Sequence, residues 1–578
     1  MKKLFFALAS LALLATACVK DEIDTVNDNT GDGGGGNVVD DDPIVTTDYD
    51  VTVSIVFSNS GDATVSGLVD SITAVTSSND VTITNISRKK VMYLLSGSTS
   101  NGFLKIYSGR KQGITLNGVS ITNTRGAAIN IQGLAETPSK GKRTDVVLNG
   151  SSTLADGNEY ILTPSTEDEK GVLFSEGQIV FSGNGTLTVN AHGKGGIVSD
   201  DYLRFADAVN ISVNSSAGHG VRGKDYILVS SGTINVNVSA DGKKGFSSDS
   251  LVRFDGGTTT IAITGNTVVE TVDGVKDTSG TAGIKADQLF EMYGGSLTIT
   301  NSGQGGKGIS CDGDAHFNGG DINITVTGSN FGSSSSGGFP GGGGHGPGGG
   351  PGGGGSSSNN SVGAKGIKCD GNIIVSGGTI VITASNHEGI ETKGTLEVNG
   401  GEVYSQSSDD AINSASDMTI NGGFVYAHST GNDGLDANGD LYIKGGVICA
   451  IGVNTPEMAI DANTEGGKKL YIQGGVLLAC GSLENGAQLT QSCWQASSWS
   501  KNVWYSLNDG TNTYAFKTPS SGGTKLVVSA SQQPTVKSNV TISGGTQRCN
   551  SMIYDNATVN GGSNVSLTTY SGGGGMGW

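Results

Sequence analysis

The sequence predicts an all-β chain that folds as a right-handed parallel β-helix, and three observations support this prediction. The composition, with 96 Gly and only 9 Pro among 578 residues, combines turn-forming residues with many Val, Ile and Thr that suit pleated strands. A short motif of alternating apolar and polar residues that ends at Gly-Gly recurs along most of the chain. Long periodic helical patterns are absent after the N-terminus.

The recurring motif has a measurable period. Its leading apolar residues in five consecutive copies, Ile367, Ile390, Ile412, Leu435 and Ile460, are 23, 22, 23 and 25 positions apart. One coil of this length holds three short strands and cannot bury its own apolar face, but stacked coils can. The period therefore predicts a solenoid with about 22–25 residues per coil. A β-propeller is the alternative, although its blades need about 40 residues or more.

The extent of the repeat sets the expected domain boundaries. Residues 1–17 are predicted to be a signal peptide and residues 18–50, which are acidic and Gly-rich, a tether. The β-helix is expected over 51–481, with a low-complexity Gly-rich insert at 328–361 that loops out. Residues 482–578 hold all four Trp residues and are predicted to be a C-terminal cap with a Gly-rich tail.

The N-terminus MKKLFFALASLALLATAC predicts where the protein is located. Lys2 and Lys3 precede an apolar run, Leu4–Leu14, that is too short to span a bilayer. The segment resembles a bacterial lipoprotein signal, with Cys18 as the acylated first residue; the alternative is a secreted protein cleaved after Ala17. The following VKDEID resembles the surface-export signal of Bacteroidetes lipoproteins. These features predict an outer-membrane lipoprotein that faces outward.

The net charge of −18 argues against nucleic acid as a partner, because phosphate binding needs clusters of Lys and Arg. The same charge is compatible with cation binding. Nucleophilic triads also find no support, since the six His residues lie in unlike contexts and no GxSxG precedes a helix. The sequence assigns no catalytic residue.

Alternation within the motif places charged side chains on the outer surface. If Ile367 points inward, then Lys368 points outward, Cys369 inward and Asp370 outward. Stacking gives outward ladders of charge that are candidates for ligand binding: Arg222, Lys285, Asp287, Asp312, Lys368, Asp370 and Lys393. Within these ladders, the lysines are expected to neutralise neighbouring aspartates.

Acidic residues gather in the later coils and form the candidate metal site: Glu388, Asp409, Asp410, Asp433, Asp436 and Asp461. Carboxylates stacked about 5 Å apart repel each other by about 1 kcal/mol or more per pair at a surface dielectric. No lysine is expected beside Glu388, Asp410, Asp433 or Asp436, so a hard cation would relieve the repulsion. Oxygen-only ligands suit Ca²⁺. The alternative is a solvated acidic face without metal.

Cys311 and Cys369 occupy the same place in two successive coils, on either side of the Gly-rich insert. Stacked Cα atoms at sheet spacing are within disulfide range. A disulfide is one reading. The other is two small inward-facing side chains, like Ala286 and Ala437 in the same place of other coils.

The turns DDAIN and NDGLDANGD, the repeated Gly-Gly units and the stretch GVLFSEGQIVFSGNGTLTVNAHGKGGIVSDDYLRF resemble a family of bacterial carbohydrate-binding β-helix proteins. These are cell-surface proteins structurally similar to pectate lyases. The resemblance covers roughly residues 85–480 and implies Ca²⁺ and plant-type polysaccharide, acidic pectin or cellulose, bound without cleavage. Ala282, Lys307 and Lys365 replace expected acid pairs, which favours the 388–461 stretch for the metal.

The leading hypothesis is therefore a cell-surface lipoprotein that captures polysaccharide on a calcium-binding face of the β-helix. Its only membrane contact would be the lipid anchor, and it is expected to be a monomer. Two alternatives remain open from the sequence: a calcium-dependent polysaccharide lyase and a structural adhesin.

Overall fold

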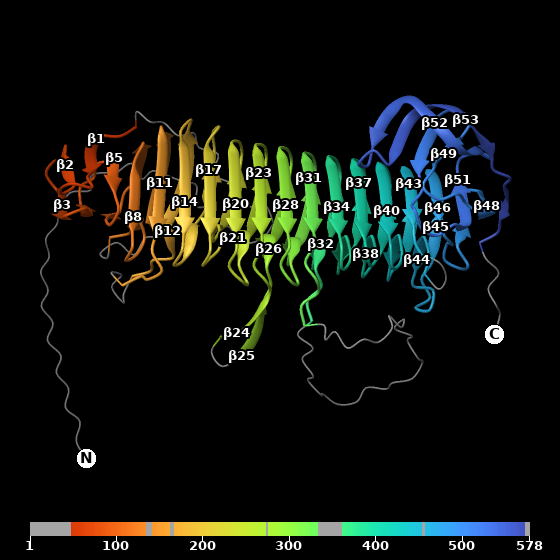
Figure 1. The fold of residues 1–578 in the computed structure, drawn as a ribbon, viewed down its shortest axis with the longest axis horizontal. Coiled ribbons are helices and arrows are strands. Elements are labelled where there is room, and N and C mark those ends of the chain that lie inside the picture. The colour runs from red at the N-terminus through yellow and green to blue at the C-terminus, as the bar shows by residue number, and fades with distance from the viewer. Residues whose placement is uncertain are drawn as a thin grey trace, which may run out of the picture. The chain divides into compact units, whose positions relative to one another are not determined.

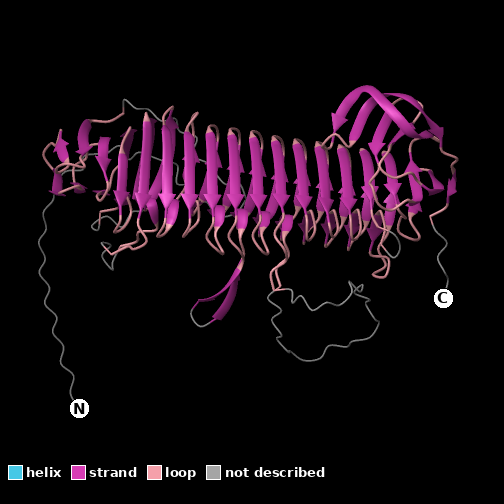
Figure 2. Cartoon of the chain, viewed as in Figure 1, coloured by secondary structure: helices cyan, strands magenta, loops and turns pink. Residues whose placement is uncertain are grey.

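The strands stack coil on coil into long parallel sheets, as the repeat predicts (Figure 1). A computed structural model describes residues 48–134, 141–161, 167–272, 275–332, 361–453 and 457–572, all within one compact unit, Asp42–Trp578. Strands and loops make up this part of the chain, which contains no helix long and apolar enough to cross a membrane (Figure 2). The predicted signal peptide, Cys18, most of the tether, the centre of the Gly-rich insert and the end of the tail lie outside the described residues.

Sheet 1 is a fifteen-stranded sheet that is parallel apart from its first pair, β3 and β4. Its strands are β3 (Ile72–Ser77), β4 (Asp80–Asn85), β6 (Phe103–Ser108), β9 (Ile129–Gln132), β12 (Gly171–Ser175), β15 (Gly195–Ser199), β18 (Val221–Gly223), β21 (Lys244–Ser248), β26 (Ala282–Ala286), β29 (Lys307–Cys311), β32 (Lys365–Cys369), β35 (Ile390–Thr392), β38 (Ile412–Ser414), β41 (Leu435–Ala437) and β44 (Ile460–Ala462).

Two further runs of strands form one 33-stranded sheet, because β5 pairs with both of them. Sheet 2 consists of β1 (Val51–Phe57), β2 (Thr64–Ser66), β5 (Val91–Thr99), β7 (Gln112–Asn117), β10 (Gly141–Asn149), β13 (Gly177–Gly183), β16 (Leu203–Phe205), β19 (Tyr226–Val229), β22 (Leu251–Phe254), β27 (Leu289–Met292), β30 (Asp314–Phe317), β33 (Ile373–Val375), β36 (Leu396–Val398), β39 (Met418–Ile420), β42 (Leu441–Ile443), β45 (Leu470–Ile472) and β47 (Gln488–Leu489).

Sheet 3 consists of β8 (Ser120–Asn123), β11 (Ser151–Asp156), β14 (Thr186–Ala191), β17 (Asn210–Ser215), β20 (Thr233–Val238), β23 (Thr258–Ile263), β28 (Ser296–Asn301), β31 (Asp321–Val326), β34 (Thr379–Ala384), β37 (Glu402–Ser407), β40 (Phe424–Ser429), β43 (Val447–Ile451), β46 (Val476–Cys480), β48 (Cys493–Ser498), β51 (Thr524–Ser529) and β54 (Thr568–Tyr570). Each regular coil adds one strand to sheet 1, then to sheet 2, then to sheet 3.

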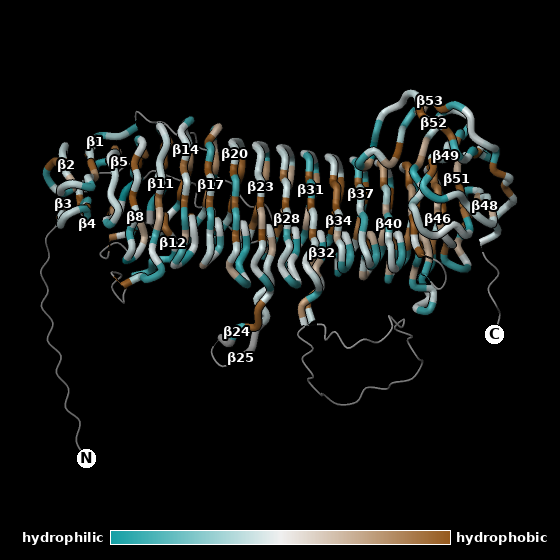
Figure 3. Tube along the Cα trace, viewed as in Figure 1, coloured by the Kyte–Doolittle hydropathy of each residue, from teal (hydrophilic) through white to brown (hydrophobic). Residues whose placement is uncertain are grey.

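The apolar residues that define the repeat stack directly on one another in sheet 1. Ile367 pairs with Ile390, Ile390 with Ile412, Ile412 with Leu435 and Leu435 with Ile460, and all five are at most 2% exposed. This confirms the register read from the sequence. Apolar segments recur from coil to coil along the strands (Figure 3).

Six phenylalanines form a column inside the solenoid. Neighbouring ring centroids lie 5.3 to 6.3 Å apart, and every ring is at most 1% exposed. The members are Phe181, Phe205, Phe246, Phe254, Phe290 and Phe317. Each ring therefore packs against at least one ring from another strand, and the column as a whole connects successive coils through side-chain contacts.

The Gly-Gly pairs of the motif form the corner between sheets 2 and 3. The second glycine has a positive φ, for example 75° at Gly401 and 80° at Gly423. A Cβ at Gly423 would lie 2.7 Å from the carbonyl oxygen of Gly401 in the coil before it. Both backbone conformation and coil spacing therefore require glycine there.

The C-terminal segment adds a closed antiparallel barrel of β49 (Trp504–Asn508), β50 (Thr513–Lys517), β52 (Thr535–Arg548) and β53 (Ile553–Asn564). The barrel packs on the outer surface of sheet 3. Tyr426 donates a hydrogen bond to the carbonyl of Lys517 at 2.9 Å, and Arg548 pairs with Glu402 at 2.8 Å. The sequence predicted a cap in this region but did not indicate a barrel.

The long insertions leave the solenoid at the corner between sheets 3 and 1. The hairpin of β24 (Val268–Val272) and β25 (Val275–Ser279) lies between β23 and β26 and projects from the stack (Figure 1). The Gly-rich insert begins after β31 and ends before β32. Phe331 and Val362 at its two ends form an antiparallel bridge.

Candidate metal site

The six predicted metal ligands lie at the corner between sheets 3 and 1, in the turns that precede β35, β38 and β41 or within β41 and β44. The structure brings five of them into two groups rather than one continuous ladder. The aspartate cluster consists of Asp433, Asp436 and Asp461, and the histidine cluster of His387, Glu388 and Asp409. In each cluster, one ligand atom per residue lies within 4.8 Å of the others.

The aspartate cluster is assembled by strand register and by burial. Asp436 in β41 pairs directly with Asp461 in β44, so that their side chains project from adjacent coils. Asp433, in the turn before β41, is only 5% exposed and accepts a hydrogen bond from the backbone N–H of Met458. Three carboxylates therefore converge without a lysine or arginine ion pair to any of them among the described side chains.

Burial and mutual repulsion raise the pKa values of this cluster. Burial, followed by the charges of Asp410, Asp461 and Asp436, raises the pKa of Asp433 to about 9. Burial and the neighbouring Asp410 and Asp461 raise the pKa of Asp436 to about 8. Burial and a hydrogen bond with Glu484 raise the pKa of Asp461 to about 8. Among the described residues, no Lys or Arg forms an ion pair that would balance the ionised form of these three carboxylates.

Asp410 lies beside the aspartate cluster and is held by hydrogen bonds. It accepts from the backbone N–H of Asp433 at 3.1 Å and from the side chain of Asn413 at 2.9 Å. Asn413 also donates to Asp436 at 2.7 Å. Asp410 therefore positions the turn that holds Asp433.

The histidine cluster differs because a lysine neutralises it. Lys365 lies 3.2 Å from Glu388 and 2.6 Å from Glu391, and His387 contacts both Glu388 and Asp409. The expectation that no lysine adjoins Glu388 is therefore wrong. Lys365 belongs to the preceding coil, and its long side chain reaches across the coil spacing. Because it contains the nitrogen of His387 and already contacts the ammonium group of Lys365, this cluster matches a hard cation less well than the aspartate cluster does.

The aspartate cluster fits calcium by its donor chemistry. Its ligands are all carboxylate oxygens, which Ca²⁺ prefers, and the raised pKa values indicate that a nearby positive charge would stabilise the ionised form. Asp433, Asp436 and Asp461 are thus the residues that would hold the ion.

The predicted ligand-binding residues project outward, but their charges are largely satisfied within the protein. Every predicted cation has an aspartate partner in its own or an adjacent coil: Arg222 with Asp249 at 2.7 Å, Lys285 with Asp287 at 3.0 Å and with Asp312 at 2.5 Å, Lys368 with Asp370, and Lys393 with Asp370 at 3.0 Å. The expected pairing of lysines with neighbouring aspartates is thus present, and it leaves these cations less available to a ligand.

Cys311 and Cys369 pair in register in β29 and β32, but both are free thiols in the structure. Each sulfur is directed to a turn carbonyl, Cys311 to Asp314 at 3.1 Å and Cys369 to Gly313 at 2.8 Å. Both side chains are buried, and no disulfide joins them in the structure. The disulfide stays a prediction, as does the alternative of two small inward-facing side chains.

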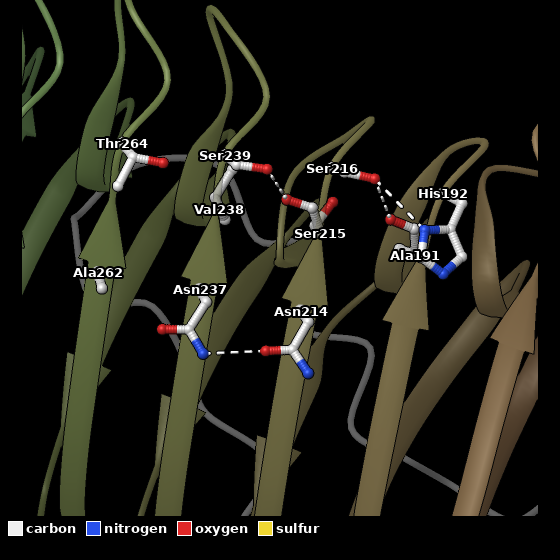
Figure 4. A pocket seen from close by; sticks show the side chains of 10 residues that line it. All are labelled: Ala191, His192, Asn214, Ser215, Ser216, Asn237, Val238, Ser239, Ala262 and Thr264. Carbon is white, nitrogen blue, oxygen red and sulfur yellow. Dashed lines mark hydrogen bonds between the residues drawn. The ribbon is translucent and has the colours of Figure 1, made fainter.

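A shallow groove of about 200 Å³ lies elsewhere, on the outer surface of β14, β17, β20 and β23 (Figure 4). Asn237 donates to Asn214 at 2.9 Å across its floor, and Ser216 donates to the carbonyl of Ala191 at 3.2 Å. Its lining contains no carboxylate, so it offers no alternative metal site.

The raised pKa values predict how pH affects the calcium-free protein. Unfolded Asp has a pKa near 3.9, whereas Asp433, Asp436 and Asp461 titrate at about 8 to 9 when folded. Their contribution to stability is fully present below about pH 4 and is lost as pH rises through 8 to 9. We expect the melting temperature in EDTA to fall by several degrees between pH 6 and pH 9, and calcium to reverse the fall. An equal fall in a variant with Asp433, Asp436 and Asp461 all replaced by Asn would show that these carboxylates do not cause the pH dependence.

Parts of the chain are similar to proteins described as carbohydrate-binding. A family model described as "Carbohydrate-binding domain-containing protein" matches residues 77–249 and 346–411. A protein of the same description from Acetivibrio thermocellus is 29% identical over 138 residues, which are 22% of this chain and 43% of that protein. The chain thus spans less than half of this relative. The solved structure of a polysaccharide lyase-like protein from C. thermocellum, a gadolinium derivative, aligns with a TM-score of 0.37 and 24% identity, over 47% of this chain and 97% of that one.

Proposed function

We propose that the protein is a carbohydrate-binding protein of the cell surface that captures acidic, pectin-like or cellulosic polysaccharide through Ca²⁺ held by the aspartate cluster, without cleaving it. In this proposal the solenoid is a right-handed parallel β-helix with about 22–25 residues per coil. A lipid on Cys18 anchors it, as a Bacteroidetes-type lipoprotein, to the outward face of the outer membrane, and it acts as a monomer.

The observation that best supports this function is the convergence of three carboxylates that lack a cationic partner among the described side chains. Bound calcium would supply a positive charge shared between these carboxylates and those of the sugar. Asp433, Asp436 and Asp461 would hold the ion, and Asp410 and Asn413 would fix the orientation of the turn around them. The match of residues 77–249 and 346–411 to a carbohydrate-binding family supports the polysaccharide as ligand.

Retention on polygalacturonate tests the proposal. Purified protein is applied to the immobilised polymer in calcium and in EDTA, while ultraviolet absorbance of unsaturated product is followed in a parallel sample. We expect retention in calcium, reduced retention in EDTA, and no new absorbance. New absorbance would favour the lyase alternative, and failure to retain any polysaccharide would favour the adhesin.

A further inference from the structure

A column of lysines lies at the same corner as the aspartate cluster, in earlier coils. The register of sheet 1 stacks Lys244 on Ala282, Ala282 on Lys307, and Lys307 on Lys365. With coils about 4.8 Å apart, Lys244 and Lys307 lie on either side of a small residue. We call these four residues the basic column. The equivalent position in the next coil is Glu388, whose backbone carbonyl accepts a hydrogen bond from the N–H of Gly366 at 3.2 Å. The side-chain charge in the column therefore changes from positive to negative at Glu388.

Lys244 and Lys307 differ in their contacts from the lysines that the sequence predicted to bind ligand. The Nζ of Lys244 donates to the carbonyl of Gly242 at 2.9 Å and to the Ser279 hydroxyl at 3.4 Å. The Nζ of Lys307 donates to the carbonyl of Gly305 at 3.5 Å. Among the described side chains, neither has a carboxylate oxygen within 4.0 Å.

This difference follows from the position of each lysine in the motif. Lys285 and Lys368 stand two residues before an aspartate of the same coil, Asp287 or Asp370, and pair with it. Lys244 and Lys307 stand at the start of their strands, where no such aspartate follows within two positions. The sequence motif therefore supplies counter-charges to Lys285 and Lys368 but not to Lys244 and Lys307, whereas Lys365 of the basic column pairs with Glu388 and Glu391.

The environment of both ammonium groups favours an added anion. Burial, with repulsion from Lys243 and Lys285, lowers the pKa of Lys244 to about 8. Burial, with repulsion from Lys368 and Lys365, lowers the pKa of Lys307 to about 8. Half-buried cations among like charges are stabilised by an opposite charge within about 4–6 Å. Both lysines remain largely protonated at neutral pH.

We propose that Lys244 and Lys307, on either side of Ala282, bind a carboxylate of an anionic polysaccharide directly, without a metal ion. This inference rests on the proposed function for its ligand class and adds a second binding mode to it. The two binding modes lie at the same corner, with the lysines in earlier coils and the aspartate cluster in later coils, on either side of the Gly-rich insert.

The test measures affinity for polygalacturonate in EDTA by calorimetry, where calcium plays no part. We expect wild type to keep measurable affinity and Lys244→Ala/Lys307→Ala to lose about tenfold or more, since charged hydrogen bonds are removed. The matched control, Lys285→Ala/Lys368→Ala, removes the same charge from ion-paired lysines and is expected to lose less than about threefold. Lys244→Gln/Lys307→Gln, which keeps the side-chain stems, replaces the alanine variant if that one does not fold.

The outcomes separate this inference from the proposed function. If wild type binds only in calcium, the inference is overturned while the calcium site stands. If wild type binds equally in calcium and EDTA, and the Lys244/Lys307 variant loses affinity in both conditions, the inference stands and the calcium mechanism fails. Equal losses in both double variants would indicate attraction to overall charge and would overturn the inference.

Discussion

Replacement of Asp433, Asp436 and Asp461 together by Asn is expected to lower calcium affinity by at least about 100-fold, because calcium affinity depends on the number of charged ligands. The substitution keeps the size of each side chain and removes all three carboxylates of the aspartate cluster, whose ligand oxygens converge within 4.8 Å. Retention on polygalacturonate in calcium should fall to the level seen in EDTA. Calorimetric titration with calcium gives the affinity directly.

The control for this variant is Asp321→Asn. Asp321 is exposed at the start of β31 in sheet 3, so the change removes one negative charge from a different surface. Calcium affinity should not change. If the triple variant binds calcium as wild type does, the ion lies elsewhere, and Glu388→Gln/Asp409→Asn then tests the histidine cluster.

Phe290→Ala is expected to lower the free energy of unfolding by about 3–5 kcal/mol. Phe290 is fully buried and lies 6.2 Å from the ring of Phe254 and 5.5 Å from that of Phe317. Its removal leaves a cavity that the rigid spacing of the coils prevents from closing. Urea denaturation followed by tryptophan fluorescence and by circular dichroism measures the change with two probes, since a solenoid need not unfold in one step.

Tyr293→Ala in the same coil is the matched control. Tyr293 is 47% exposed; its ring centre lies 4.6 Å from the guanidinium of Arg253, and its hydroxyl donates to Glu291 at 3.1 Å. Its loss should lower stability by no more than about 1 kcal/mol. Similar losses in the two variants would mean that the phenylalanine column does not connect the coils.

The sequence predicted the fold well because register in a solenoid follows from the repeat itself. Ile367, Ile390, Ile412, Leu435 and Ile460 were enough to align the coils, and the alternation around Ile367 correctly placed Cys369 inside and Asp370 outside. The barrel was missed because its long strands, β52 and β53, lie outside the repeat and pair antiparallel.

The candidate site was predicted less completely, because contacts between coils depend on side-chain length as well as on register. Lys365 reaches Glu388 in the next coil, which a ladder of equivalent positions does not reveal. Lys307 was noted in the sequence only as a departure from an expected acid pair, and Lys244 was not singled out. That neither lysine has a carboxylate partner among the described side chains became visible only from the contacts in the structure.

The corner between sheets 3 and 1 is a place where the length of the sequence between two strands changes from coil to coil. Phe331 and Val362 hydrogen-bond to each other at 2.9 and 3.0 Å, so the chain that leaves the stack returns to the same point. Doubling the length of a flexible loop between fixed ends costs only about 0.6 kcal/mol. A foreign domain could therefore be displayed at this corner, beside the proposed polysaccharide site, while the three sheets keep their register.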